Sequence, residues 1–145
     1  MLKNEEKVKV FSNIAKINRA MQRELNKRLD KIGLTYLDFL VLRALTEGQS
    51  TMVSLSRRFY VTQSAMTIAI DRLERNGLVK RERDKQDRRV IYVKITDEGI
   101  KIFQKAIEVY LQLAEEILNG IDTELIMETI NNLEKILEKI NSLKD

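Results

Sequence analysis

The sequence has 145 residues, of which 43% are hydrophobic and 33% charged, with a net charge of +4; this length fits one folded domain that buries its own core. Cysteine and histidine are both absent, which excludes disulfides, thiol chemistry, the usual zinc ligands and the side chain that most often moves protons near neutral pH. Since the five glycines are also scattered singly and form no phosphate-binding loop, we expect a protein that is not an enzyme and needs no metal and no cofactor.

No stretch of the sequence predicts insertion into a membrane. No apolar run approaches the roughly 18 residues that a membrane span needs. The N-terminal stretch MLKNEEKVKV mixes acids with lysines and lacks the apolar centre of a signal peptide. We therefore expect a cytoplasmic protein that has no membrane partner.

Charge is distributed unevenly along the chain. Residues 1–49 carry 10 Lys and Arg against 6 Asp and Glu, residues 50–96 carry 11 against 5, and residues 97–145 carry 5 against 11. A basic middle segment followed by an acidic one concentrates the positive field on one part of the fold. This pattern is typical of a protein whose middle segment binds a nucleic acid.

The first two predicted elements are helices. Apolar residues recur at spacings of three and four from about Glu5 to Ile32, which predicts one long amphipathic helix. Thr35, with Asp38 three residues later, resembles a capping box and predicts a second helix that ends near residue 48. Glycine often follows the end of a helix because it adopts the left-handed conformation cheaply. The glycines placed in this way are Gly33, Gly48, Gly77 and Gly120.

The middle of the chain predicts a helix-turn-helix followed by a hairpin. A short helix from about Met52 to Tyr60, a brief turn and a helix from Gln63 to Asn76 form the helix-turn-helix, with Thr62 as the N-cap of the second helix. The segments LVKRER and VIYVKI are typical of strands, and DKQD between them is the turn. Helix, helix-turn-helix and hairpin in this order make a winged helix.

The last third of the chain predicts two long helices. Thr96 caps a helix that runs to about Leu118, and the final helix runs from about Asp122 to Leu143. The apolar residues of the final helix have the alternating four-three spacing of a coiled-coil seam. A helix with a long apolar stripe does not order alone, so we expect the terminal helices to form a homodimer. The alternative is that they pack only on each other within one monomer.

The second helix of the helix-turn-helix has two unlike faces. Its predicted core positions are Met66, Ile70 and Leu73. Its opposite face carries small and polar side chains that fit a major groove: Gln63 offers an amide suited to adenine, and Ile68 or Ala65 an apolar surface for a thymine methyl group. The alternative is an ordinary solvated helix face. The candidate DNA contacts here are Thr62, Gln63, Ser64, Ala65, Thr67, Ile68 and Arg75.

The stretch RERDKQDRRVIYVKIT, residues 81–96, joins a charged turn to an alternating strand. Most charged turns are simply solvated, but this one directly follows a helix whose face fits a DNA groove. The candidate DNA contacts in this wing are Arg83, Lys85, Asp87, Arg88 and Arg89. For Arg57, Arg58, Arg72 and Arg75, phosphate contact and solubilising charge are equally good interpretations.

The segment from Leu55 to Gly99 resembles the winged helix of MarR-type transcription regulators. The residues that carry the resemblance are Leu55, Val61, Leu73, Gly77-Leu78-Val79, Asp87-Arg88-Arg89 and Thr96 with Gly99. The Asp-Arg-Arg of the wing, the strand after it and the Thr-x-x-Gly are its specific part. The resemblance extends over nearly the whole chain, because long terminal helices bracket the winged helix as the dimerisation helices of that family do.

The resemblance implies roles for the wing residues. In that family the arginine that matches Arg89 enters the minor groove, and the aspartate that matches Asp87 braces it. A narrow minor groove concentrates negative potential, and arginine carries a permanent, weakly hydrated charge. Arg88 would then contact a phosphate or the same groove. The recognition helix begins with Gln63, where many relatives carry arginine. This difference affects which bases the helix would recognise, but not which DNA groove it would enter.

The resemblance also implies a small-molecule effector. Members of that family often bind small aromatic or phenolic anions where the dimerisation helices meet the winged helix. The matching candidates here are Lys16, Arg19, Tyr36 and Tyr110. Cations would bind a carboxylate while tyrosine rings cover its aromatic body. The alternative is that these are ordinary helix-junction tyrosines and solvated cations.

The sequence therefore predicts a mainly α fold with a small two- or three-stranded antiparallel β-wing. Residues 33–96 would form the winged helix-turn-helix, and residues 1–32 and 97–145 the helical dimerisation region. The expected function is a dimeric, sequence-specific regulator of transcription, a repressor, that binds pseudo-palindromic double-stranded DNA. Residues 63–76 would enter the major groove and residues 80–95 the minor groove. The alternatives are an architectural or weakly specific DNA-binding protein without an effector, and a helical scaffold for protein partners.

Overall fold

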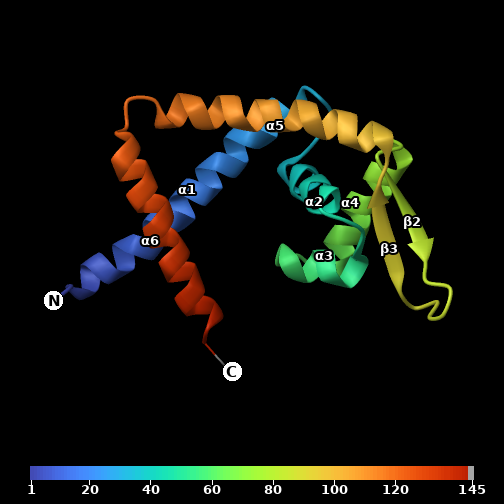
Figure 1. Cartoon of the computed structure of the whole chain (residues 1–145), viewed down its shortest axis with the longest axis horizontal. Coiled ribbons are helices and arrows are strands. Elements are labelled where there is room, and N and C mark those ends of the chain that lie inside the picture. Colours follow the sequence, from blue (N-terminus) through green and yellow to red (C-terminus); the bar gives the residue numbers. More distant parts are fainter. Residues whose placement is uncertain (144–145) are drawn as a thin grey trace. The chain divides into compact units, whose positions relative to one another are not determined.

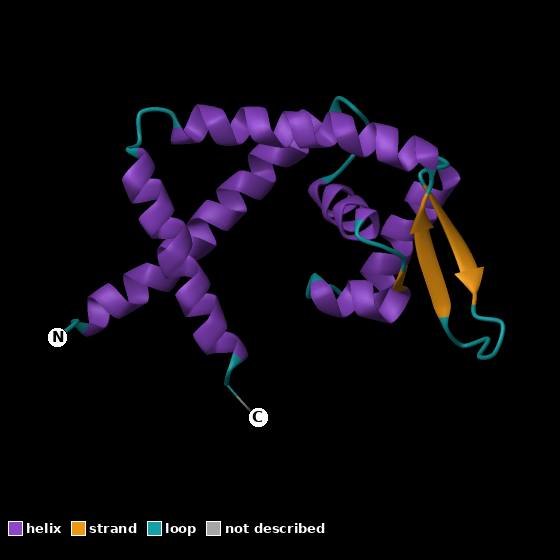
Figure 2. Cartoon of the chain, viewed as in Figure 1, coloured by secondary structure: helices purple, strands orange, loops and turns teal. Residues whose placement is uncertain are grey.

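The computed structural model describes residues 1–143, which form six helices and one small sheet (Figures 1 and 2). The helices are α1 (Asn4–Asp30), α2 (Tyr36–Thr46), α3 (Met52–Arg58), α4 (Gln63–Arg75), α5 (Asp97–Leu118) and α6 (Thr123–Asn141). The strands are β1 (Ser50–Thr51), β2 (Val79–Arg83) and β3 (Ile91–Ile95). The predicted fold class, mainly α with a small antiparallel wing, is confirmed.

The chain divides into two compact units. The first, Met1–Leu111, holds helices α1 to α4, the sheet and most of α5, and the second begins at Gln112 and contains α6. The sequence prediction divided the chain by function, at residues 33 and 97, and that division stays a prediction. None of the helices in the described part of the chain is long and apolar enough to cross a membrane.

Short-range side-chain signals set the helix ends as predicted. Thr35 Oγ1 accepts a hydrogen bond from the Asp38 amide at 3.1 Å, and Asp38 Oδ2 accepts one from the Thr35 amide at 2.9 Å, which completes the capping box of α2. Thr62 Oγ1 accepts from the Ala65 amide at 3.0 Å and caps α4. All four glycines predicted to end helices have positive φ.

The core of the first unit forms where α2, α3 and α4 pack on one another and on the sheet. Figure 1 shows these three helices on one side of the β2–β3 hairpin. The predicted core positions of α4, Met66, Ile70 and Leu73, are all buried. Burial of this side of α4 leaves the opposite side facing away from the protein.

The sheet has the order β1-β3-β2, and both pairs are antiparallel. β3 lies in the centre, with Val93 opposite both Ser50 of β1 and Arg81 of β2. The two-residue strand β1 was not predicted as a separate element. Figure 2 shows the loop that joins β2 to β3 at the end of the hairpin away from α5. The loop at residues 84–90 is therefore free to reach a partner.

The Thr-x-x-Gly motif joins the hairpin to α5. Thr96 Oγ1 donates to the Gly77 carbonyl at 2.6 Å and accepts from the Gly99 amide at 3.0 Å. A Cβ atom on Gly99 would collide with the carbonyl oxygen of Leu78, so glycine permits this close approach. The motif thus fixes the segment that follows α4 against the start of α5.

Both terminal helices expose apolar side chains. The first half of α1 exposes Val8, Val10, Phe11, Ile14 and Ile17. The exposed apolar residues of α6 are Leu125, Met127, Ile130, Leu133, Leu137 and Ile140. α6 has no buried residue. Runs of this size on a helix face are typical of surfaces that another protein surface covers.

Candidate nucleic-acid interface

The outer face of α4 presents most of the predicted base-contacting residues to solvent. Thr62, which caps the helix, and the side chains that follow it on this face are exposed: Gln63, Ser64, Thr67, Ile68 and Arg75. Ala65 is half-buried. The face is polar at its beginning and carries one large apolar side chain, Ile68, which is 64% exposed. Such a face can meet the base edges of a major groove.

In the wing, Asp87 binds both the backbone amide and the guanidinium of Arg89. The Asp87 carboxylate accepts hydrogen bonds from the Arg89 amide at 3.1 Å, from Nε at 3.1 Å and from Nη2 at 3.3 Å. The Arg89 side chain is nevertheless 91% exposed. These hydrogen bonds from Arg89 hold the pKa of the Asp87 carboxyl below its usual range. The predicted bracing of Arg89 by Asp87 is thus present in the protein alone.

The tip of the hairpin is closed by its own polar contacts. Arg83 Nη1 donates to the Arg88 carbonyl at 2.8 Å, and Asp84 Oδ2 accepts from the Asp87 amide at 3.3 Å. Lys85 and Arg88 are exposed at this tip. Arg83 therefore shapes the loop in addition to supplying positive charge, whereas Lys85 and Arg88 present their charge to solvent.

An open groove of about 410 Å³ separates the recognition helix from the wing. Gln63 and Thr67 of α4 line one side, and Arg89 and its neighbours in the hairpin line another. The remaining residues of the lining are Thr51, Met52, Val53, Arg81, Val90 and Ile91. The groove therefore lies between the two elements that the sequence assigned to different DNA grooves.

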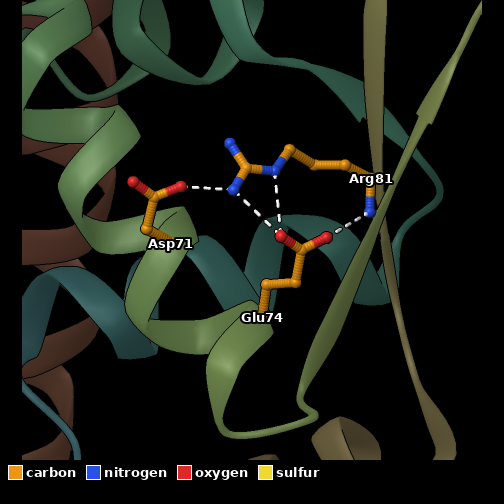
Figure 3. Close-up of polar contacts among 3 residues, drawn as sticks. All are labelled: Asp71, Glu74 and Arg81. Atoms are coloured by element: carbon orange, nitrogen blue, oxygen red, sulfur yellow. Dashed lines mark hydrogen bonds and ion pairs between the residues drawn. The ribbon is translucent and has the colours of Figure 1, made fainter.

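Arg81 links the wing to the recognition helix (Figure 3). From strand β2 its guanidinium reaches Glu74 Oε1 at 2.9 Å through Nη2 and at 3.2 Å through Nε, and its Nη2 also binds Asp71. Its backbone amide donates to Glu74 Oε2 at 3.2 Å. The hydrogen bond from the Arg81 side chain is the main cause that holds the pKa of Glu74 below its usual range. The sequence reasoning did not single out Arg81.

The other arginines near the helix-turn-helix differ in their partners. Arg72 of α4 forms an ion pair with Asp38, which is 1% exposed. Arg58 lies 3.4 Å from a carboxylate oxygen of Glu47. Arg75, by contrast, is exposed at the end of α4. Arg72 thus links α4 to α2 through a buried carboxylate, which gives it a structural role.

Two of the candidate effector residues lie in one aromatic group. The ring of Phe39 stacks on Tyr110 at a centroid distance of 5.3 Å and on Tyr36 at 6.4 Å. Burial is the main cause that raises the pKa of the Tyr36 phenol, with Tyr110 adding to the shift. Both effects favour the neutral form of the Tyr36 phenol.

A second cavity of about 410 Å³ lies beside Tyr36. Its lining consists of Gln22, Asn26, Thr35, Tyr36, Leu37, Leu40, Phe59 and Val61. Lys16, Arg19 and Tyr110 are not part of this lining, and the two cations are exposed on α1. The structure thus groups Tyr36 with Tyr110 through Phe39 and groups neither tyrosine with Lys16 or Arg19.

Known proteins share both the sequence and the fold of this chain. The family model of the transcriptional regulators SarA/Rot matches residues 24–106. The crystal structure of the transcriptional regulator BldR from Sulfolobus solfataricus is 43% identical, with a TM-score of 0.87, over 96% of this chain and 99% of that one. A mutant form of Escherichia coli MarR, complexed with operator DNA, is 25% identical, with a TM-score of 0.78, over 94% and 99% of the two chains. The chain belongs to the MarR family of winged helix-turn-helix transcriptional regulators.

Membership of the MarR family confirms the resemblance inferred from the wing motif. It also confirms the prediction that the chain is a regulator of transcription and not an enzyme. Among curated relatives, the organic hydroperoxide resistance transcriptional regulator of Bacillus subtilis is 28% identical over 93 residues. The match covers 63% of each chain, so this chain spans less than two thirds of that relative's length.

Proposed function

We propose that this MarR-family protein is a dimeric repressor that binds a specific pseudo-palindromic site in double-stranded DNA. Helix α4 enters the major groove, and the wing places Arg89 in the adjacent minor groove. The arrangement of α4, the wing and the groove between them carries this proposal. The MarR relative whose structure includes operator DNA supports it.

The groove between α4 and the wing fits the passage of one DNA strand. A phosphodiester backbone separates each major groove from the neighbouring minor groove, so a protein that enters both must leave a concave path for it. Here the path is about 410 Å³ and is lined by Arg81 and Arg89. Thr67 on one wall and the wing on the other are placed to contact the two grooves on either side.

The apolar residues that α1 and α6 expose support dimerisation. Their burial against a second copy would remove this surface from water, at about 25 cal/mol for each Å². Two recognition helices related by a twofold axis would then meet half-sites about 34–36 Å apart. The seam spacing of α6, with Ile126, Ile130 and Leu133 in sequence, supports a helix-to-helix contact.

A small aromatic or phenolic anion is the proposed effector, bound near Tyr36. The cavity beside Tyr36 and the neutral phenol there support this proposal. Isothermal titration calorimetry with salicylate is expected to give heat with the wild-type protein and little with Tyr36→Ala. Absence of heat with the wild type, together with unchanged DNA affinity in salicylate, would rule out an effector of this class.

The test of DNA binding compares Arg89→Ala with a charge-matched control. DNA affinity is expected to fall about 5- to 150-fold, or roughly 1–3 kcal/mol, if Arg89 reads the minor groove directly. Arg23→Ala removes the same charge from an exposed position on α1, outside α4 and the wing, and is expected to change affinity little. Fluorescence anisotropy with a labelled duplex and excess random DNA measures both effects.

Two results would count against the proposal. Equal affinity of wild type and Arg89→Ala would contradict the placement of the wing. Complete displacement of the labelled duplex by random DNA would instead favour an architectural or weakly specific binder.

A further inference from the structure

Ile68 occupies an unusual place for an apolar side chain. Between Val61 and Thr96, all of which the structure describes, it is the one exposed large apolar residue. A single exposed apolar side chain is ordinary on a protein surface. Ile68, however, lies on the outer face of α4, which is the face proposed to enter the major groove, so its exposure suggests a contact with DNA.

Helical geometry places Ile68 near the middle of that face. Successive residues of an α-helix turn by about 100°, so Ser64, Ile68 and Arg75 project within a narrow sector. The buried residues Met66 and Leu73 project on the opposite side. Gln63 and Thr67 lie to one side of this sector and line the groove that faces the wing. Ile68 therefore points away from the core and away from the wing groove.

Ile68 is the residue of this face best suited to make an apolar contact with DNA, because its neighbours are polar or small. Asp71 lies one turn further along, where an unpaired carboxylate would repel DNA, but its charge is paired with Arg81. Ala65, the other apolar candidate, is half-buried and has a short side chain. Of the two, Ile68 has the exposure and the length to reach a base.

We infer that Ile68 reads the C5-methyl group of a thymine in each half-site, an inference that rests on the proposed DNA-binding function. An isoleucine side chain neither donates nor accepts a hydrogen bond, so it discriminates through apolar contact alone. In the major groove the thymine methyl is the apolar group that distinguishes one base pair from the others. The half-site therefore contains a thymine opposite the middle of α4.

Replacing thymine by deoxyuracil tests this inference, because the exchange removes the methyl group and keeps the Watson–Crick pairing. The probe is the duplex that wild-type protein selects from random DNA, with uracil placed at one thymine position of both half-sites at a time. At one position wild-type affinity is expected to fall about fourfold for each half-site, the effect of one buried methyl group. For Ile68→Ala the thymine and uracil duplexes are expected to bind equally at that position.

Ile100→Ala is the matched control, since Ile100 is also an exposed isoleucine but lies on α5. This variant is expected to keep the wild-type preference for thymine over uracil. If every uracil substitution affects wild type and Ile68→Ala by the same factor, the inference is wrong while specific DNA binding stands. If the wild type selects no sequence, the proposed function fails and the inference falls with it.

Discussion

Arg89 is an exposed cation whose direction is set by its neighbour two residues earlier. Three hydrogen bonds to the Asp87 carboxylate hold the amide and guanidinium of Arg89, while most of its side chain stays in solvent. Exposed ion pairs of this kind contribute little to folding stability. Asp87 therefore contributes to the orientation of Arg89. Because it already restricts the Arg89 side chain in the free protein, less conformational entropy would be lost when Arg89 enters a DNA groove.

The pKa of the Asp87 carboxyl gives a direct readout of this contact. Because the pKa is lowered in the folded protein, the contact is complete at neutral pH and is lost as the pH falls through the lowered value. An NMR titration of the Asp87 carboxyl carbon is expected to show a midpoint below the ordinary aspartate range. In Arg89→Ala the midpoint is expected to rise into that range, and an unchanged midpoint would show that Arg89 does not hold the carboxylate.

Single residues were predicted well where their partners are close in sequence. Thr35 with Asp38 and Thr62 with Ala65 are each three residues apart, so the capping pattern alone indicates the contact. The pairing of Asp87 with Arg89, two residues apart, came from the resemblance of the wing motif. The pair of Arg72 with Asp38 joins residues that are 34 apart. Such a pair depends on how α2 and α4 pack, which a short sequence pattern does not contain.

At the scale of elements, the contact between α4 and β2 makes the recognition helix and the wing one unit. Arg81 bonds to Glu74 and Asp71, which lie one turn apart on α4. The two carboxylates face the side of α4 that lies toward the wing, and one guanidinium neutralises much of their charge. The proposed DNA path beside Arg81 is therefore less repulsive to phosphate than the acids of α4 alone would make it.

Arg81→Gln is expected to weaken DNA binding about tenfold, which corresponds to roughly 1.4 kcal/mol. The substitution removes a cation from the groove and leaves the carboxylates of Asp71 and Glu74 without their partner. Fluorescence anisotropy over a range of salt concentrations measures the loss and its electrostatic part.

A second substitution separates charge from folding in this variant. Adding Asp71→Asn to Arg81→Gln removes one of the freed carboxylates and is expected to restore part of the affinity. Circular dichroism checks that both proteins keep their helices. If the double variant binds DNA no better than Arg81→Gln, the loss does not come from the freed charge of Asp71.

The elements themselves were predicted closely, because periodicity and caps are local. All six helices and both strands of the hairpin lie where the patterns indicated them, with ends that differ by a few residues. Strand β1 was missed because two residues, Ser50 and Thr51, are too short to show alternation and become a strand only by pairing with β3. The positive φ of Tyr60, in the turn before α4, also had no sequence signal, since glycine is the usual residue there.

At the scale of the whole molecule, charge and apolar surface point to two kinds of partner. The basic segment at residues 50–96 contains α4 and the wing, and the apolar residues of α1 and α6 stay exposed in a single chain. The first feature is expected of a DNA-binding surface and the second of a dimer interface. The sequence indicated both, since charge distribution and apolar spacing are visible without a fold.

The candidate site was predictable in part. The wing cations and the face of α4 follow from the motif and from helical spacing. The groove between them and the role of Arg81 depend on how the hairpin lies against the helix, and the sequence alone does not contain that placement. The four effector candidates came from resemblance, and of these only Tyr36 lines the cavity between α1, α2 and the helix-turn-helix.

In vitro selection of bound duplexes from random DNA tests whether this chain is a dimeric, sequence-specific DNA-binding protein. The expected result is an enriched sequence made of two inverted half-sites whose centres lie about 10–10.5 base pairs apart, one turn of DNA. Arg89→Ala is expected to bind this sequence more weakly than wild type does. Recovery of no enriched sequence, or of a single half-site bound by a monomer, would show that the protein does not bind DNA as a sequence-specific dimer.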